Sequence, residues 1–589
     1  MQHQTISGQR IPSGDNGLQV NFCKNPICPN FGNPASEERQ PRGRRANARG
    51  DTYKVEGASH KTEVKCLLCG ETPPLKSNIA ISEEIIRLAE YLSLAKEPTC
   101  PNESCDNRLI GIKTPKAYYS YGKTASGSQR YRCRICNTTF AVSSRTTLRQ
   151  RLPDINEMVF RLLVNKMPLK RICETANISM DTLYRKIDFI HKQCLTFAAS
   201  YERLLPQMVI PRLYLSVDRQ NYNINWMQAE DKRNIVLNAL GSADNKTSYI
   251  FGIHVNYDAN IDAKSVENDA EKLGDNLLRS PFRRYARVWL AQDYLAACGK
   301  NTLRRRRKKF LRDSIEDGYS EAAEREDVET SDIQTTETSL PYNGMLIHSD
   351  YTLYGHFFFL RSLFASVGKV RFYLDQESGI RAACLSAFWI EVLEKRCEAF
   401  YVSVNKDLTI NQKRRLKANS VRDLADFRAT SAAYEPLTDH DLRHIVIKER
   451  LNELVDIGKW RDRWLFYPFP DMSEPEKAIC WLTDLQDKAY DADHLASLYS
   501  KVTLHGIDRF FMQARRRLSL LERPIATSSS EGRKWYGYSP YNPASVGKML
   551  EIFRVFYNFV EPGKDKRTPA MRLGLSKSIN TISEILDNR

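Results

Sequence analysis

The sequence predicts a multidomain protein in which two small cysteine-rich modules and an all-α domain precede an α/β domain interrupted by insertions. Its 589 residues are far more than one hydrophobic core usually holds. Eight of the 14 cysteines lie before residue 140, in two sets with similar spacing. Farther along the chain, segments that alternate like strands are followed by segments with helical spacing.

The charge of the chain favours a polyanionic partner. The formal net charge is +17 and the isoelectric point is near 9.1, which favours nucleic acid over a membrane surface. A basic protein without such a partner is the alternative. Because no apolar run is long enough to cross a bilayer and the polar N-terminus lacks the apolar segment of a secretion signal, we expect no membrane association. A reducing cytoplasm is expected, where cysteines bind metal rather than form disulfides.

Each cysteine set combines a C-x4-C pair with a later C-x2-C pair, which indicates an internal duplication. A short loop directs two thiolates to one point, and two facing pairs give the tetrahedral cage that Zn²⁺ prefers. We predict two structural zinc ribbons, in residues 1–75 and 99–150, joined by a helix within residues 76–98. The predicted Zn²⁺ ligands are Cys23, Cys28, Cys66, Cys69, Cys100, Cys105, Cys133 and Cys136.

Basic and aromatic residues alternate in the second ribbon. Arg130, Arg132 and Arg134 are interleaved with tyrosines in "YYSYGK" and "RYRCR". Cations beside aromatic rings suit phosphate contact combined with base stacking. A solvated loop face is the alternative explanation of this pattern.

Residues 151–205 contain apolar residues at helical spacing in three pieces, which predicts a helix-turn-helix. Pro168 suits the first turn of the second helix, and Ser179 suits the N-cap of the third. The third helix would present Thr182, Tyr184 and Arg185 near the end that enters the major groove of DNA. An ordinary three-helix bundle is the alternative.

Asp218 ends the apolar run of "RLYLSVDRQNYNINW", a segment that alternates like a strand. Two more strand patterns follow, and three antiparallel strands with an acid on the first are typical of the start of an RNase H-type fold. This first part of the core is assigned to residues 210–258, and the second part to residues 346–405. In the second part Asp375 ends another strand, a position that points into the crevice of an open α/β sheet.

Residues 490–560 complete the predicted core with the helix "TLHGIDRFFMQARRRLSLLER". It carries Asp508, followed by Arg515, Arg516 and Arg517. Three carboxylates from separate segments can bind two Mg²⁺ or Mn²⁺ ions for phosphoryl transfer. Each acid taken singly could instead be a strand-end cap or a surface residue. Asp350 and Glu522 are reserve candidates.

Two insertions separate the parts of the core, and a tail follows it. Residues 259–345 contain a basic run at 304–309 and an acidic tract at 313–337 that is predicted to be disordered. The basic run suits DNA binding or charge balance against that tract. Residues 406–489 are rich in aromatics that suit either DNA contact or core packing, and residues 561–589 form the tail.

The order of these motifs resembles DDE-type transposases of bacterial insertion elements, over about residues 100–559. The segments that carry the resemblance are the ribbon end "RYRCRIC", "YLSVDRQNYNINW", "RFYLDQESGIRAA" and "HGIDRFFMQARRRL". It implies an RNase H-like core in which Asp218, Asp375 and Asp508 hold catalytic Mg²⁺ or Mn²⁺. The family carries glutamate where this sequence has Asp508.

The resemblance also implies binding partners and a subcellular location. Double-stranded DNA, at the element ends and at the target, would be bound by the ribbons, the helix-turn-helix and the arginines 515–517. The protein would be a homo-oligomer on that DNA. The location would be the bacterial cytoplasm, at the nucleoid when bound. A catalytically inactive DNA-binding regulator that retains the fold is the alternative, and the change from glutamate to Asp508 favours it.

Overall fold

The computed structural model describes residues 9–38, 51–56, 62–95, 97–112, 114–125, 127–142, 146–147, 150–301, 312, 315–316, 338–377, 379–405, 408–458, 461–486, 490–522 and 537–587. The chain divides into two compact units. One contains residues 1–88, 208–512 and 524–544, and the other contains residues 89–207, 513–523 and 545–589. The predicted basic run at 304–309 and nearly all of the acidic tract lie outside the described residues.

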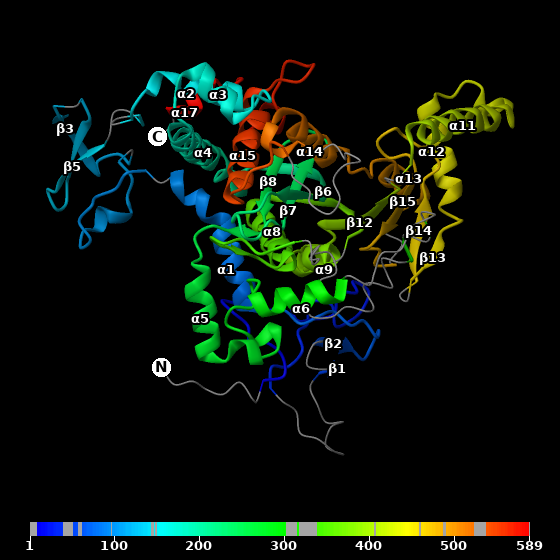
Figure 1. Ribbon diagram of the computed structural model, residues 1–589. Coiled ribbons are helices and arrows are strands. Elements are labelled where there is room, and N and C mark those ends of the chain that lie inside the picture. Colours follow the sequence, from blue (N-terminus) through cyan, green and yellow to red (C-terminus); the bar gives the residue numbers. More distant parts are fainter. Residues whose placement is uncertain are drawn as a thin grey trace. The chain divides into compact units, whose positions relative to one another are not determined.

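The first unit is built on a mixed sheet, which among the described residues has eight strands in the order β13-β14-β15-β12-β11-β6-β7-β8 (Figure 1). Strand β6 pairs antiparallel with β7 and parallel with β11, and β11 pairs parallel with β12. The prediction of a multidomain α/β protein is confirmed. The strands span Ile210–Ile224 (β6), Ile235–Asp244 (β7), Ile250–Val255 (β8), Val367–Asp375 (β11), Cys397–Val404 (β12), Val455–Ile457 (β13), Asp462–Phe466 (β14) and Lys477–Trp481 (β15).

Helices α8 and α14 cover opposite faces of the central strands. Successive side chains of a strand point to opposite faces. Ser216 on β6 accepts a hydrogen bond from the Ile507 amide of α14 (3.0 Å), whereas Arg219 donates to Ser349 of α8 (3.2 Å). The strands are buried on both faces for this reason, and the six residues of β8 are all buried. The helices span Ser349–Leu363 (α8) and His505–Arg517 (α14).

Other helices of the first unit lie in and around the two predicted insertions. The short strands β9 and β10 pair with each other at the edge of the first insertion. The second insertion supplies helices and also the outer strands β13 to β15 of the large sheet. These elements span Tyr257–Asp258 (β9), Met345–Leu346 (β10), Ala263–Leu273 (α5), Ala291–Asn301 (α6), Ile380–Ala387 (α9), Trp389–Leu393 (α10), Ile410–Ala429 (α11), Asp439–Arg450 (α12) and Ala492–Ser500 (α13).

The first cysteine-rich module packs inside the first unit. Its strands β1 (Tyr53–Glu56) and β2 (Glu63–Cys66) form a hairpin. The ring of Phe22 meets the Trp389 ring edge to face, with 6.2 Å between centroids. Lys76 forms an ion pair with Asp350 of α8, and both side chains are only 5% exposed. Because an unpaired buried charge is strongly destabilising, loss of either Lys76 or Asp350 should destabilise the fold.

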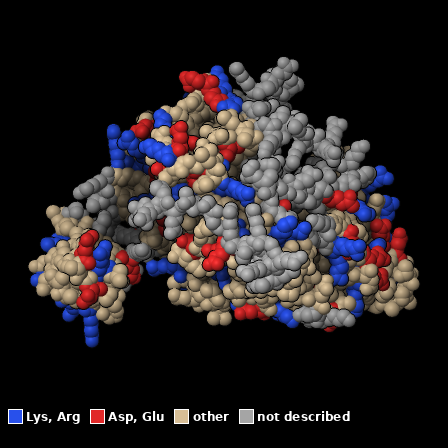
Figure 2. Space-filling view, turned by 90° about the horizontal axis from the view of Figure 1, so that it is seen from below, with Lys and Arg blue, Asp and Glu red and all other residues tan. Residues whose placement is uncertain are grey.

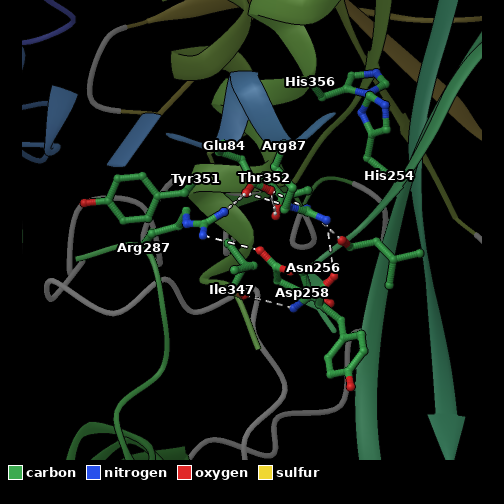
Figure 3. A network of polar contacts seen from close by, with 12 residues as sticks. Glu84, Arg87, His254, Asn256, Asp258, Arg287, Ile347, Tyr351, Thr352 and His356 are labelled. Atoms are coloured by element: carbon green, nitrogen blue, oxygen red, sulfur yellow. Dashed lines mark hydrogen bonds and ion pairs between the residues drawn. The ribbon is translucent and has the colours of Figure 1, made fainter. Parts of the chain in front are cut away.

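Helix α1 (Asn78–Ala89) contacts α8 through the buried carboxylate of Glu84 (Figure 3). Glu84 is fully buried and pairs with Arg87 (2.6 Å) and Arg287 (3.0 Å). Thr352 of α8 donates a hydrogen bond to the same carboxylate (3.1 Å). Burial raises the pKa of Glu84, but the two guanidinium groups more than offset this effect and leave the pKa below its usual value.

The second unit contains the second cysteine-rich module and the predicted helical domain. The module has a three-stranded antiparallel sheet, β3 (Tyr118–Lys123), β4 (Gln129–Cys133) and β5 (Thr139–Val142). Three helices follow, α2 (Asn156–Leu163), α3 (Leu169–Ala176) and α4 (Met180–Glu202). Helices α15 (Ala544–Val555), α16 (Pro569–Leu573) and α17 (Ile582–Leu586) complete the unit.

The C-terminal helices pack against α4. Arg554 of α15 forms a fully buried ion pair with Glu202 at the end of α4 (2.5 Å). The Gln193 side chain donates to the backbone carbonyl of Leu586 (2.7 Å). Rings of Phe197 and Phe559 meet edge to face at 5.1 Å. The predicted tail therefore contributes ordered helices to this unit.

The contact between the first module and α10 gives a test of their packing. Gly32 has φ of +78°, and a Cβ atom there would lie 2.2 Å from a Trp389 ring carbon. Gly17 has φ of +80° and no atom within 4 Å of such a Cβ, so it is a matched control. Both alanine variants should carry the backbone strain of about 1–3 kcal/mol. Gly32→Ala should lose roughly 1–3 kcal/mol more in denaturant unfolding, because the indole must move. Equal losses would contradict the packing.

Candidate metal centres

The first cysteine set converges on one point. The sulfur atoms of Cys23 and Cys69 are 3.4 Å apart, and those of Cys28 and Cys66 are 3.6 Å apart. All four lie within 4.8 Å of one another, and all are free thiols. A tetrahedral Zn²⁺ site with bonds of about 2.3 Å has sulfur atoms about 3.8 Å apart, so the four residues fit this metal.

The second set repeats the geometry. The Cys100 and Cys136 sulfurs are 3.3 Å apart, and the Cys105 and Cys133 sulfurs are 3.6 Å apart. These four also lie within 4.8 Å of one another. Both cysteine clusters predicted from spacing are therefore confirmed as groups that can hold structural zinc.

The two modules match beyond their cysteines, which supports the internal duplication. In the first, the Tyr53 hydroxyl accepts from the Cys23 amide (3.0 Å), and Asn30 donates to the Cys66 sulfur (3.1 Å). In the second, Tyr118 accepts from the Cys100 amide (2.8 Å). Asn107 likewise donates to Cys133 there (3.3 Å). Such outer contacts orient metal ligands and reduce the charge on the sulfur.

In each cluster the pKa of one thiol is lowered and the pKa of another is raised. A hydrogen bond from Cys23 lowers the pKa of Cys69 to about 5, and contact with Thr138 lowers the pKa of Cys136 to about 6. Burial raises the pKa of Cys28 and of Cys100 to about 12. Four thiolates cannot be buried together without a cation, so a bound divalent metal is what would allow all four to ionise.

The predicted DNA-binding arginines of the second module lie beside tyrosine rings. The guanidinium carbon of Arg130 is 5.3 Å from the Tyr121 ring centre, and that of Arg132 is 5.6 Å away. Arg134 lies 5.6 Å from the Tyr119 ring centre. We call these five residues the Tyr–Arg ladder. Strands β3 and β4 hold it in place by pairing Tyr119 with Arg132.

The predicted recognition helix has the expected start. Ser179 is the N-cap of α4 and accepts from the Thr182 amide (3.3 Å). Tyr184 and Arg185 are exposed, and Arg185 forms an exposed ion pair with Asp181 (2.9 Å). Pro168 is the N-cap of α3 rather than a residue of its first turn. Tyr184 and Arg185 are thus accessible to a partner.

Charge does not mark a binding surface on the part of the molecule that Figure 2 shows. On the face seen in Figure 2, the Lys and Arg side chains of the described residues are interspersed with Asp and Glu. The positive charge of the chain, +17 in total, therefore does not form one continuous basic patch on this face. Local groups such as the Tyr–Arg ladder carry more information about a partner than the total charge.

Three carboxylates cluster where β6 and β11 run side by side. Parallel pairing places Leu374 opposite Val217, so that Asp218 and Asp375 come next on their strands. Carboxylate oxygens of Asp218, Asp375 and Glu377 lie within 4.8 Å of one another. Two of the predicted acids are thus brought together, and the D-x-E spacing of Asp375 and Glu377 is the signal that would have revealed the third member.

Backbone and side-chain donors hold this acid cluster. The Arg219 amide donates to Asp218 (2.7 Å), and the Gln376 amide donates to Asp375 (3.1 Å). The Arg219 guanidinium pairs with Glu377 (2.9 Å). Asp218 is only 4% exposed. Carboxylates held this close repel one another, which favours a bound cation, and hard oxygen ligands suit Mg²⁺ or Mn²⁺.

Asp508 is not a member of this acid cluster among the described residues. It lies half-buried in the first turn of α14. The reserve candidates are engaged elsewhere, because Asp350 pairs with Lys76 and Glu522 pairs with Lys166. The role of Asp508 as a third acid stays a prediction.

The arginines after Asp508 differ in their surroundings. Arg516 is exposed and Arg515 is half-buried. Arg517 pairs with Glu561 and lies 5.4 Å from the Phe556 ring centre. Arg517 therefore already has a structural contact, and Arg516 is the most accessible of the three.

Comparison with protein-family models finds no match, and neither does comparison with curated proteins. No helix in the described ranges has both the length and the apolarity needed to cross a membrane.

The cysteine clusters predict two Zn²⁺ ions per chain, each bound independently. Cys133→Ser should halve the zinc content measured by elemental analysis, because three thiols bind Zn²⁺ far more weakly than four. Cys194→Ser is the control, since Cys194 is buried outside both clusters and should leave the zinc content unchanged. Loss of both ions in Cys133→Ser, or of none, would contradict two separate sites.

Proposed function

We propose that the protein is a DNA transposase whose large sheet is an RNase H-like catalytic core. The observation that carries this proposal is the placement of Asp218 and Asp375 at neighbouring positions of two parallel strands. The strand order supports it as well. Three antiparallel strands, β8, β7 and β6, are followed by the parallel strands β11 and β12, as expected for an RNase H-type sheet.

The acids have the chemistry that DNA strand cleavage and transfer require. Asp218 and Asp375 would hold Mg²⁺ or Mn²⁺, and Glu377 or Asp508 would supply a further oxygen ligand. Such ions activate an attacking oxygen and stabilise the leaving oxygen of a phosphodiester. Arg219 would have to release Glu377 before that carboxylate could serve as a ligand, because the two are paired at 2.9 Å.

DNA recognition would belong to the second unit. The Tyr–Arg ladder offers cations for phosphates and rings for stacking, and α4 offers exposed Tyr184 and Arg185. Arg516 adds an exposed cation on α14. The proposed partner is double-stranded DNA at element ends and target. The protein would act as a homo-oligomer in the bacterial cytoplasm, at the nucleoid.

A catalytically inactive DNA-binding regulator is the second candidate function. The absence of Asp508 from the acid cluster favours it among the described residues, as does the pairing of Glu377 with Arg219. In that case the same surfaces would bind DNA without cutting it. The two candidates differ in one observable property, metal-dependent cleavage.

Asp218→Asn separates the two functions. DNA carrying the sequences that flank the gene should be nicked by the wild-type protein with Mg²⁺ or Mn²⁺, and the variant should lose about 10³-fold or more of that rate because it loses a metal ligand. DNA binding by gel shift should persist, since the ladder and α4 are untouched. Asp456→Asn is the control, because Asp456 is an exposed acid on β13 of the same sheet. A wild-type protein that binds but never nicks would establish the regulator.

A further inference from the structure

The N-terminus of α14 is held by side chains from three different parts of the first unit. Glu474 accepts from the Leu504 amide (2.7 Å) and from the Thr503 hydroxyl (2.6 Å). Asn245 accepts from the Gly506 amide (3.1 Å). Ser216 on β6 accepts from the Ile507 amide (3.0 Å). The first amides of a helix have no partner within the helix, so these acceptors fix where it begins.

Glu474 belongs to the second insertion, in the loop between β14 and β15. Its second oxygen pairs with Lys477 (2.8 Å), which also donates to the Val502 carbonyl (2.8 Å). Both side chains are buried, with exposures of 5% and 8%. A buried carboxylate at a helix N-terminus also interacts favourably with the helix dipole. The second insertion thus forms hydrogen bonds with the start of α14 through the carboxylate of Glu474.

Two glycines allow α14 to lie close to the sheet. A Cβ atom on Gly506 would be 2.3 Å from the Asn245 side-chain oxygen and 2.9 Å from the Ser216 hydroxyl. A Cβ atom on Gly241 would be 2.6 Å from Ile507. Gly241 is the β7 residue directly opposite Asp218. The helix start therefore rests on the part of the sheet that carries the first predicted acid.

We propose that Glu474 is a positioning residue for strand cleavage, and that the second insertion acts in the reaction through it. By holding the amide of Leu504, Glu474 would fix the start of α14 and with it Asp508, the residue that follows the Ser216-bound Ile507. Asp508 would then serve as the acid that completes the metal site. This inference rests on the proposed function.

The test compares nicking by the full-length protein and its variants, with DNA that carries the gene's flanking sequences. Glu474→Ala removes the acceptor. The double variant Glu474→Gln with Lys477→Met keeps an acceptor for Leu504 but removes both buried charges. Glu453→Ala is the control, since Glu453 is an exposed acid of the same insertion whose side chain is 61% exposed.

Glu474→Ala should lower kcat roughly 10- to 100-fold, because small misplacements of catalytic groups have effects of that size. Its KM for DNA should stay unchanged, and amide hydrogen exchange at residues 504–507 should accelerate. The double variant and Glu453→Ala should keep kcat near the wild-type value. If Glu474→Ala does not fold, Glu474→Met with Lys477→Met replaces it, because this pair of substitutions also removes the acceptor and leaves no unpaired buried charge.

Two results would overturn the positioning role. One is wild-type kcat in Glu474→Ala or in its replacement, Glu474→Met with Lys477→Met. The other is a Glu474→Gln double variant that loses as much rate as Glu474→Ala, because the charge pair rather than the acceptor would then matter. A wild-type protein that does not nick DNA would instead overturn the proposed function, and the inference with it.

Discussion

The parallel pairing of β6 with β11 is the constraint on which the candidate site depends. It brings the ends of two distant segments together and places Asp218 beside Asp375. Alternation along β6 then sends Ser216 and Arg219 to opposite faces, toward α14 and α8 respectively. A shift of one residue in this register would turn one of the two acids to the opposite face of the sheet and separate it from the other. The contacts of both covering helices with β6 follow from this alternation.

The two cysteine-rich modules share one design but differ in their surroundings. Both place a tyrosine hydroxyl on the first cysteine amide and an asparagine on a cysteine sulfur. The first is part of the unit that contains the sheet, where Lys76 and Phe22 contact Asp350 and Trp389. The second carries the Tyr–Arg ladder. Zinc in the first module would mainly stabilise the core, whereas zinc in the second would support the surface that we propose binds DNA.

Local signals in the sequence predicted much of this structure. The cysteine spacing identified both clusters, Ser179 identified the start of α4, and the ends of apolar strands identified Asp218 and Asp375. These features depend on neighbouring residues, so a pattern along the chain reveals them. Gly70 and Asn137, which follow the second cysteine pairs, have φ of +79° and +60°, as such turns require.

Contacts between distant segments were not predictable in the same way. No periodicity indicates that Gly32 lies against Trp389, or that Glu474 holds the start of α14. Residues 406–489 were expected to be an insertion, yet three of their segments extend the large sheet as β13, β14 and β15. Antiparallel pairing of short strands depends on hydrogen bonds between segments, which composition does not encode.

Anomalous X-ray scattering from crystals soaked in Mn²⁺ would locate an ion held by Asp218 and Asp375 without assuming activity. A metal bound by both acids should give an anomalous peak about 2.0–2.3 Å from carboxylate oxygens of Asp218 and Asp375. The same map would show whether Glu377 or Asp508 completes the coordination. Saturating Mn²⁺ with no peak between Asp218 and Asp375 would contradict a catalytic metal site at the ends of β6 and β11.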